Sequence, residues 1–341
     1  MNPTWLNHLT SAGAVIDNGS VARFGDPGAA LRASPLLMDL SHLSLLAVSG
    51  DDAETFLQGQ FTNDVRQATL AQGQYSAHCT PKGRMLASFF IWKEEDGYRL
   101  QLPGTMMEGF AKRLSMYVLR AKVKVSDISD NTVRLGVAGH GASEVLGRQT
   151  PNLPSADREV TRHEGMSIIR LGAERFEVVA APERAVALWQ ALAGECTPAG
   201  PSRWDWFDIR AGIPAILPPT REEFVPQMVN FEALGGVSFK KGCYAGQEIV
   251  ARAQHIGQVK RRMYLAHVEA EMPPQAGDSL HYADGEEAAQ GKVVNAEISP
   301  EGGYDLLAVI PVAAAEGDVR LWGESGPRLE LLPLPYSLEQ A

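Results

Sequence analysis

Residues 239–252 have the sequence FKKGCYAGQEIVAR, the most distinctive stretch of the chain and the one that points to its fold. Glycines on both sides of Cys243 free the backbone, and the residues from Gly246 onward are good helix formers. We therefore expect Cys243 just before a helix N-terminus, where the helix dipole favours negative charge. Lys240 and Lys241 add positive charge, so the pattern predicts a reactive, nucleophilic thiol. The alternative is a small buried hydrophobic residue, as most free cysteines are.

Composition indicates an ordinary globular chain. Its 341 residues suggest about two domains, and the hydrophobic (45%) and charged (21%) fractions exclude a disordered, collagen-like or disulfide-framework protein. No apolar run approaches the roughly 20 residues of a membrane helix, and the first thirty residues lack a secretory signal pattern. Three cysteines without a CxxC pair indicate reduced thiols and a cytoplasmic protein, and the histidine spacings predict no metal site.

The charge is unevenly distributed. Residues 240–262 carry six basic residues against one acid, a local charge of +5 on a chain of net charge -10. Such a basic segment suits a carboxylate tail, a phosphate or an RNA backbone, and Lys240 and Arg252 are the candidate anion contacts. The alternative is a solvated surface face.

Hydrophobic periodicity predicts an α+β fold with two α+β lobes and a small C-terminal antiparallel β-barrel. The first thirty-five residues read as an irregular lead-in. Helices are expected at 53–57, 105–117 and 182–192, and strands at 45–48, 73–78, 84–92, 98–102, 133–138, 163–171 and 175–180. The barrel strands are expected at 263–268, 280–282, 291–298, 304–310 and 319–322. The predicted domains are residues 36–253, containing the two lobes, and residues 254–341, containing the barrel.

The stretch around Cys243 resembles the KGCYxGQE signature of the YgfZ-type folate-binding proteins, relatives of the glycine-cleavage T-protein. Further matches run along the chain from about residue 36. They are AHC at 77–79 with KG at 82–83, IRAGIP at 209–214, FVPQ at 224–227, ALGG at 233–236 and LPYSLE at 334–339.

This resemblance implies three lobes in a ring around a central folate channel, with tetrahydrofolate or a one-carbon derivative as cofactor. It implies a role in assembly or repair of iron–sulfur enzymes, including tRNA-modifying ones, under oxidative stress. The implied partners are folate, iron–sulfur enzymes or cluster carriers, and tRNA; we expect a monomer without membrane contact. Cys243 is the implied catalytic residue, within a motif that contains Lys241, Gly242, Tyr244, Gly246, Gln247 and Glu248.

A reduced folate needs a carboxylate or amide for the pterin edge, flat apolar walls, and a cation for its glutamate tail. Residues 202–210 (SRWDWFDIR) supply aromatic, acidic and basic side chains, and we assign folate binding to Trp204 and Arg210. The alternative is that these aromatic residues form a core seam. Where the T-protein has a pterin-holding acid, this chain offers Glu174 and Glu177, each of which also reads as a surface charge.

Departures from the T-protein pattern bear on the activity. None of Asp51, Asp52 and Asp64 can be assigned as the T-protein's catalytic aspartate, and Leu43 stands where some close relatives have a tryptophan near the channel. Glycine-cleavage aminomethyl transfer is therefore not expected. Three functions remain open: a folate-dependent accessory factor, a folate-dependent one-carbon transferase, and a non-catalytic docking scaffold. A strand-end cysteine usually packs, so Cys79 is expected to be buried, and Cys196 reads as a loop residue without chemistry.

Overall fold

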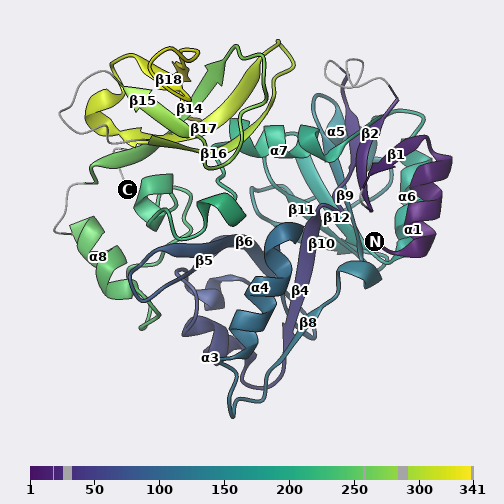
Figure 1. Ribbon diagram of the computed structural model, residues 1–341. Coiled ribbons are helices and arrows are strands. Elements are labelled where there is room, and N and C mark those ends of the chain that lie inside the picture. Colours follow the sequence, from purple (N-terminus) through teal and green to yellow (C-terminus); the bar gives the residue numbers. More distant parts are fainter. Residues whose placement is uncertain (18, 26–32, 256–258, 283–290, 339–341) are drawn as a thin grey trace. The chain divides into compact units, whose positions relative to one another are not determined.

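The computed structural model describes residues 1–17, 19–25, 33–255, 259–282 and 291–338 (Figure 1). The chain forms two compact units that interleave along the sequence. Unit 1 consists of residues 1–54, 66–74 and 90–204, and unit 2 of residues 55–65, 75–89 and 205–341. The predicted boundary near residue 254, which runs into the undescribed residues 256–258, stays a prediction.

Unit 1 contains a six-stranded sheet with the order β10-β11-β12-β9-β3-β13. All neighbouring strands are antiparallel except β13, which runs parallel to β3. The strands are β3 (Leu36–Asp39), β9 (Val133–Ala138), β10 (Val160–His163), β11 (Met166–Arg170), β12 (Arg175–Ala180) and β13 (Thr197–Ala199).

One face of this sheet is apolar and carries the core of unit 1. Val133, Leu135 and Val137 of β9 pack there with residues of α1 (Pro3–Ser11) and α6 (Pro182–Leu192). Because side chains alternate along a strand, Arg134 and Gly136 project from the opposite face. The sequence alternation thus produces one hydrophobic face and one face with charged residues.

A five-stranded sheet with the order β5-β6-β7-β4-β8 contains the division between the units, which falls at residues 89 and 90 of β6. Its strands are β4 (Leu43–Ser49), β5 (Gln74–Cys79), β6 (Met85–Glu94), β7 (Gly97–Pro103) and β8 (Lys124–Asp127). In unit 1, α4 (Gly104–Ser115) packs on β4, β7 and β8. The short helices α3 (Ala53–Gln58) and α5 (Ala142–Gly147) follow β4 and β9.

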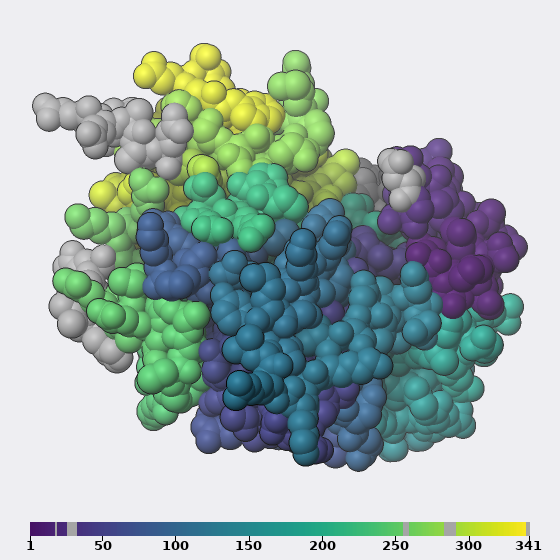
Figure 2. All heavy atoms as spheres, turned by 60° about the horizontal axis from the view of Figure 1, so that its bottom comes forward, coloured from purple at the N-terminus to yellow at the C-terminus, as the bar shows by residue number. Residues whose placement is uncertain are grey.

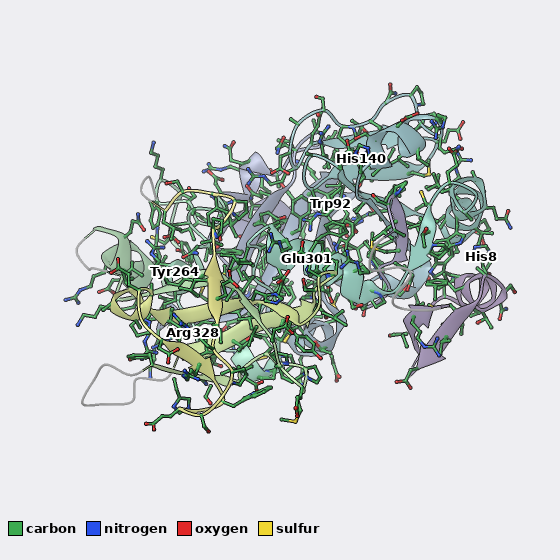
Figure 3. The ribbon with its side chains drawn as sticks, turned by 90° about the horizontal axis from the view of Figure 1, so that it is seen from above. His8, Trp92, His140, Tyr264, Glu301 and Arg328 are labelled. Atoms are coloured by element: carbon green, nitrogen blue, oxygen red, sulfur yellow. The ribbon has the colours of Figure 1, made fainter. Side chains whose placement is uncertain are left out.

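Unit 2 contains a curled six-stranded antiparallel sheet with the order β18-β15-β16-β17-β14-β19 (Figure 1). Its strands are β14 (Arg261–Val268), β15 (Ser279–Tyr282), β16 (Gly291–Ile298), β17 (Tyr304–Pro311), β18 (Val319–Leu321) and β19 (Glu330–Leu332). Arg328, labelled in Figure 3, forms a bridge with Arg320 of β18, just before the chain enters β19 at the other edge. The expected C-terminal β sheet is therefore present and barrel-like.

Both faces of the curled sheet are covered, which explains its nearly continuous hydrophobic strands. Leu306 and Ala308 of β17 belong to the cluster on one face. Leu307 and Val309 belong to the other cluster, which also contains residues from the segment 209–250. That segment runs from the end of α7 (Pro201–Arg210) to the first turn of α8 (Gln247–His255).

Two secondary-structure predictions were wrong. The lead-in contains α1 and the hairpin of β1 (Ala14–Asp17) and β2 (Ser20–Phe24). Asn2 caps α1 by accepting hydrogen bonds from the backbone of Thr4 and Trp5, and helix packing buries Trp5. The strand predicted at 163–171 is instead the hairpin of β10 and β11, because Glu164 and Gly165 take positive φ angles (47° and 77°) and reverse the chain.

Candidate functional site

Cys243 is exposed at the surface of unit 2, in a short loop between buried residues. The space-filling view shows this part of the chain, in green, reaching the surface (Figure 2). The predicted helix is present as α8 and begins at Gln247, four positions after Cys243. The dipole of α8 therefore acts only weakly on the thiol, since its effect falls off within the first turn.

The side chain of Lys241 is buried, so its ammonium group does not contribute to the surface charge. Only 6% of the residue is exposed. Its Nζ donates hydrogen bonds to the backbone carbonyls of Gln58 (2.7 Å), Phe61 (2.6 Å) and Asn63 (2.9 Å). Nζ also lies 5.1 Å from the ring centroid of Tyr244. The ammonium group thus ties the start of the loop to the end of α3 and the segment that follows it.

Gly246 ties the other end of the loop to a neighbouring turn. Its φ is +83°, and a Cβ at this position would lie 2.3 Å from the carbonyl oxygen of Thr80 and 2.9 Å from Cα of Gly83. A Cβ on Gly242 would meet nothing within 4 Å. Of the two motif glycines, only Gly246 is therefore required by a close backbone approach.

The other motif residues lie beside this loop. Tyr244 is buried, and burial, followed by the neighbouring Cys79, raises the pKa of its hydroxyl. Gln247 donates its backbone N–H to the carbonyl of Tyr244 (3.2 Å), and Glu248 is exposed. Tyr244 thus packs inward while Cys243 projects outward.

Cys79 and Cys196 are buried, in contrast to Cys243. Burial raises the pKa of Cys79 to about 12. Burial and the nearby Glu195 carboxylate raise the pKa of Cys196 to about 11. Cys79 is packed as expected, and Cys196 lies in the expected loop, between α6 and β13, where it is buried in the core of unit 1.

The basic segment keeps only part of its predicted surface charge. Lys241 is internal, and Arg262 forms an ion pair with the Glu232 carboxylate, whose side chain is almost fully buried. Lys240, Arg252 and Lys260 are exposed. Lys240 and Arg252 are thus placed where an anion can reach them.

The two residues assigned to folate differ in accessibility. Trp204 is 1% exposed: Cε3 of its ring fills the space where Gly136 lacks a Cβ, and the Arg175 guanidinium lies 5.0 Å from the ring centroid. A ligand could touch this ring only if neighbouring side chains moved, and its role in folate binding stays a prediction. Arg210 is partly exposed at the end of α7, 3.6 Å from the Asp305 carboxylate.

A group of buried polar residues in unit 1 was missed from the sequence. Glu177 was expected to be a surface charge, but it is fully buried and accepts a hydrogen bond from Nε2 of Gln101 (2.8 Å). Arg134 is 2% exposed, and its Nε and Nη1 have no hydrogen-bond partner among the described residues. Burial lowers the pKa of Arg134, opposed by the carboxylates of Glu177 and Asp39. The alternation of side chains along β9 and β12 predicts that Arg134 and Glu177 lie on the sheet face opposite the hydrophobic core. It does not predict that this second face of the sheet is buried as well.

A second buried carboxylate joins α7 to the curled sheet of unit 2. Asp305 accepts a hydrogen bond from Nε1 of Trp206 (2.8 Å), and its other oxygen lies 2.8 Å from Nδ1 of His267. Burial alone would lower the pKa of His267, but hydrogen bonds and charge from Asp305 and Glu269 outweigh it and raise that pKa. This cluster is structural in its contacts, since it links the part of α7 that belongs to unit 2 with the curled sheet of the same unit.

The part of the chain that the structure describes has neither a candidate metal centre nor a candidate membrane-spanning helix. Among the described residues, no group of three or more His, Cys, Asp or Glu side chains could hold a metal ion. Within the same residues, no helix combines the length and apolar character that crossing a membrane requires.

Comparison with known proteins agrees with the motif. The family model of the GCVT N-terminal domain matches residues 20–203. Curated relatives named tRNA-modifying protein YgfZ, from Escherichia fergusonii and Shigella dysenteriae serotype 1, are each 35% identical over 317 residues, which cover 92% of this chain and 97% of theirs. The corresponding protein of Escherichia coli O45:K1 is 34% identical over the same length.

A solved structure shows the same fold. The glycine cleavage system aminomethyltransferase T from Bartonella henselae superimposes with a TM-score of 0.76 at 18% sequence identity, covering 99% of this chain and 97% of that one. Together with the identity to the curated relatives and the matched domain, this establishes that the chain belongs to the YgfZ family of tRNA-modifying proteins, with an aminomethyltransferase-like fold.

Proposed function

We propose that this protein is a tetrahydrofolate-binding accessory factor for assembly or repair of iron–sulfur enzymes, including tRNA-modifying ones, and that the Cys243 thiol is its working group. One observation carries the proposal. In a chain of the YgfZ family, the cysteine of the KGCYxGQE motif is exposed in a loop whose two ends are fixed. A thiol that served only packing would be buried, as Cys79 and Cys196 are.

The substrate of the thiol in this proposal is a cluster, or the carrier of one, on a partner protein. The other two cysteines are buried, so they cannot join Cys243 at the surface without a rearrangement. Lys240 and Arg252 supply exposed positive charge in the same segment, which suits an acidic partner or the phosphates of tRNA.

The polar residues of unit 1 fit the polar edge of a folate. Glu177 and Gln101 provide a carboxylate and an amide side by side, the pair of groups that can bind the donors and acceptors of a pterin. Because Glu177 is fully buried, the side chains that cover it move aside in this proposal when a folate binds. Arg134 contributes buried N–H groups that lack a partner among the described residues, and such groups favour an incoming acceptor. When bound, a reduced folate would supply a carried one-carbon unit.

The roles of these residues in that proposal are to bind and orient. Glu177 accepts hydrogen bonds, Gln101 holds the Glu177 carboxylate in position, and Arg134 balances its charge. The ring of lobes around a channel, implied by the family resemblance, stays a prediction.

Titration of the purified full-length protein with tetrahydrofolate in a calorimeter tests the cofactor part. Glu177→Gln should weaken binding by about tenfold to a hundredfold, since hydrogen bonds to charged groups contribute about 1.5–3 kcal/mol. Glu183→Gln, which alters an exposed glutamate on α6 of the same unit, is the matched control and should bind like the wild type. No heat of binding for the folded wild-type protein would refute the folate assignment.

Complementation of a bacterial strain that lacks its YgfZ protein tests the thiol part. Cys243→Ala should fold and bind folate normally but fail to complement, and Cys196→Ala, which removes a buried thiol, should complement. Incubation with labelled methylene-tetrahydrofolate and total tRNA separates this function from a one-carbon transferase. We expect no transfer of label.

A further inference from the structure

We propose that Lys241 is the positioning residue of the Cys243 loop, and that it acts by directing its ammonium group at three backbone carbonyls and not by its charge on the thiol. The role of Cys243 itself rests on the function proposed above, but the order of the loop can be measured without it.

The contacts of Nζ converge on one short segment. Gln58 is the last residue of α3, where helix carbonyls have no partner within the helix. Phe61 and Asn63 follow within five residues, and all three carbonyl oxygens lie within 2.9 Å of Nζ. An ammonium group has three donors, which is the number of these carbonyls.

The same segment is held independently by residues before Lys241. Thr62 donates its hydroxyl to the carbonyl of Gly236 (2.7 Å), and Ser238 donates its backbone N–H to the carbonyl of Thr62 (3.0 Å). Residues 58–63 therefore form a fixed base, and Lys241 is the last anchor to it before Cys243. Beyond the cysteine, Gly246 packs on the turn that contains Thr80.

Between these anchors, only Gly242 and Cys243 are exposed. A Cβ on Gly242 would meet nothing within 4 Å, so no close packing restricts the backbone there. Anchoring at Lys241 is therefore what limits the motion of Cys243 on its N-terminal side.

A different role for Lys241 would be electrostatic, with the lysine pair stabilising a thiolate through space. Lys240 is the matched control for this alternative, because it carries the same charge one residue further from Cys243 and is exposed. An electrostatic effect would be shared by the two lysines and screened by salt, whereas anchoring belongs to Lys241 alone and persists at high salt.

Cys243 offers a selective probe, since it is the exposed cysteine of this chain while Cys79 and Cys196 are buried. A methanethiosulfonate nitroxide attached to Cys243 reports loop motion by electron paramagnetic resonance, with Cys243→Ser as the blank. In Lys241→Met the label should become several-fold more mobile, and the backbone amide of Gln247, which donates to Tyr244 within the loop, should exchange hydrogen at least about tenfold faster. In Lys240→Met both readouts should match the wild type, at low and high salt.

Lys241→Arg provides a second variant, because a planar guanidinium keeps the charge but cannot aim at three converging carbonyls in the same way. We expect an intermediate label mobility, and this variant decides the question if Lys241→Met does not fold. Wild-type mobility in both Lys241 variants, or equal changes in Lys240→Met and Lys241→Met, would overturn the proposal. Full complementation by Cys243→Ala would instead refute the proposed function and leave the anchoring result intact.

Discussion

Replacing Gly246 by alanine should destabilise unit 2 through two separate effects. The first is backbone strain: at φ +83° a residue with a Cβ costs about 1–2 kcal/mol. The second is overpacking, because the new Cβ would meet the Thr80 carbonyl oxygen at 2.3 Å and the backbone of Gly83 at 2.9 Å. These neighbours are backbone atoms and cannot rotate away, so overpacking adds about 1–3 kcal/mol.

The two effects together predict a loss of about 2–5 kcal/mol in the free energy of unfolding. Urea unfolding followed by circular dichroism measures it: with a slope near 3 kcal/mol per molar urea, the midpoint of the transition that involves unit 2 should fall by about 1 M. The two units need not unfold together, so the two transitions are fitted separately where they are resolved.

Gly242→Ala is the matched control within the same motif. A Cβ there would meet nothing within 4 Å, so the change in stability should stay within about 0.5 kcal/mol. Wild-type stability of Gly246→Ala, or an equal loss in both variants, would refute the packing of the loop against the turn at 80–83.

Three further predictions concern other parts of the molecule. In the native protein a maleimide should modify Cys243 rapidly and the two buried cysteines only after unfolding, as counted by mass spectrometry; rapid modification of all three would contradict the structure. Gly136→Ala should cost about 1–3 kcal/mol of unfolding free energy in a urea titration, because its Cβ would lie 2.6 Å from the Trp204 ring; an unchanged midpoint would contradict that packing. Because the pKa of His267 is raised in the folded state, the stabilisation it gains from Asp305 should be full below the unfolded-state pKa near 6.5 and lost as pH rises through the higher folded-state pKa. The difference in unfolding free energy between wild type and His267→Gln should thus shrink as pH rises above about 6.5, and a growing difference would reverse the assigned sign.

Gly109→Ala serves as the control for the substitution at Gly136. Gly109 is an exposed position inside α4, and a Cβ there would meet nothing within 4 Å. Since alanine favours a helix over glycine, this variant should be more stable by about 0.5–1 kcal/mol.

Local patterns predicted much of the fold. The strands at 133–138 and 175–180 and the helix at 182–192 have the predicted bounds, because alternation along the strands and a proline at the helix start are local signals. The lead-in was misread because α1 has only nine residues and owes its stability to the burial of Trp5 against distant residues. The turn at Glu164 was missed because a positive φ at a residue other than glycine leaves little trace in the sequence.

The site was predictable in its position but not in its contacts. The motif indicated which cysteine to examine, and Cys243 is exposed. The two lysines read alike in the sequence, yet one is at the surface and the other is buried on carbonyls that are about 180 residues away along the chain. Glu177 likewise reads as a surface charge, and only tertiary structure shows its burial beside Gln101. Long-range convergence of backbone and side chains produces these environments, and no local pattern encodes it.

The central claim is that the exposed thiol of Cys243, and not folate binding alone, carries the function. The most direct measurement is the content of modified nucleosides in bulk tRNA, by mass spectrometry, from a strain whose YgfZ protein is replaced by Cys243→Ser at wild-type abundance. The account predicts that the nucleosides lost without YgfZ remain lost, while the purified variant still binds tetrahydrofolate. Restoration of these nucleosides to the level given by the wild-type protein would contradict it.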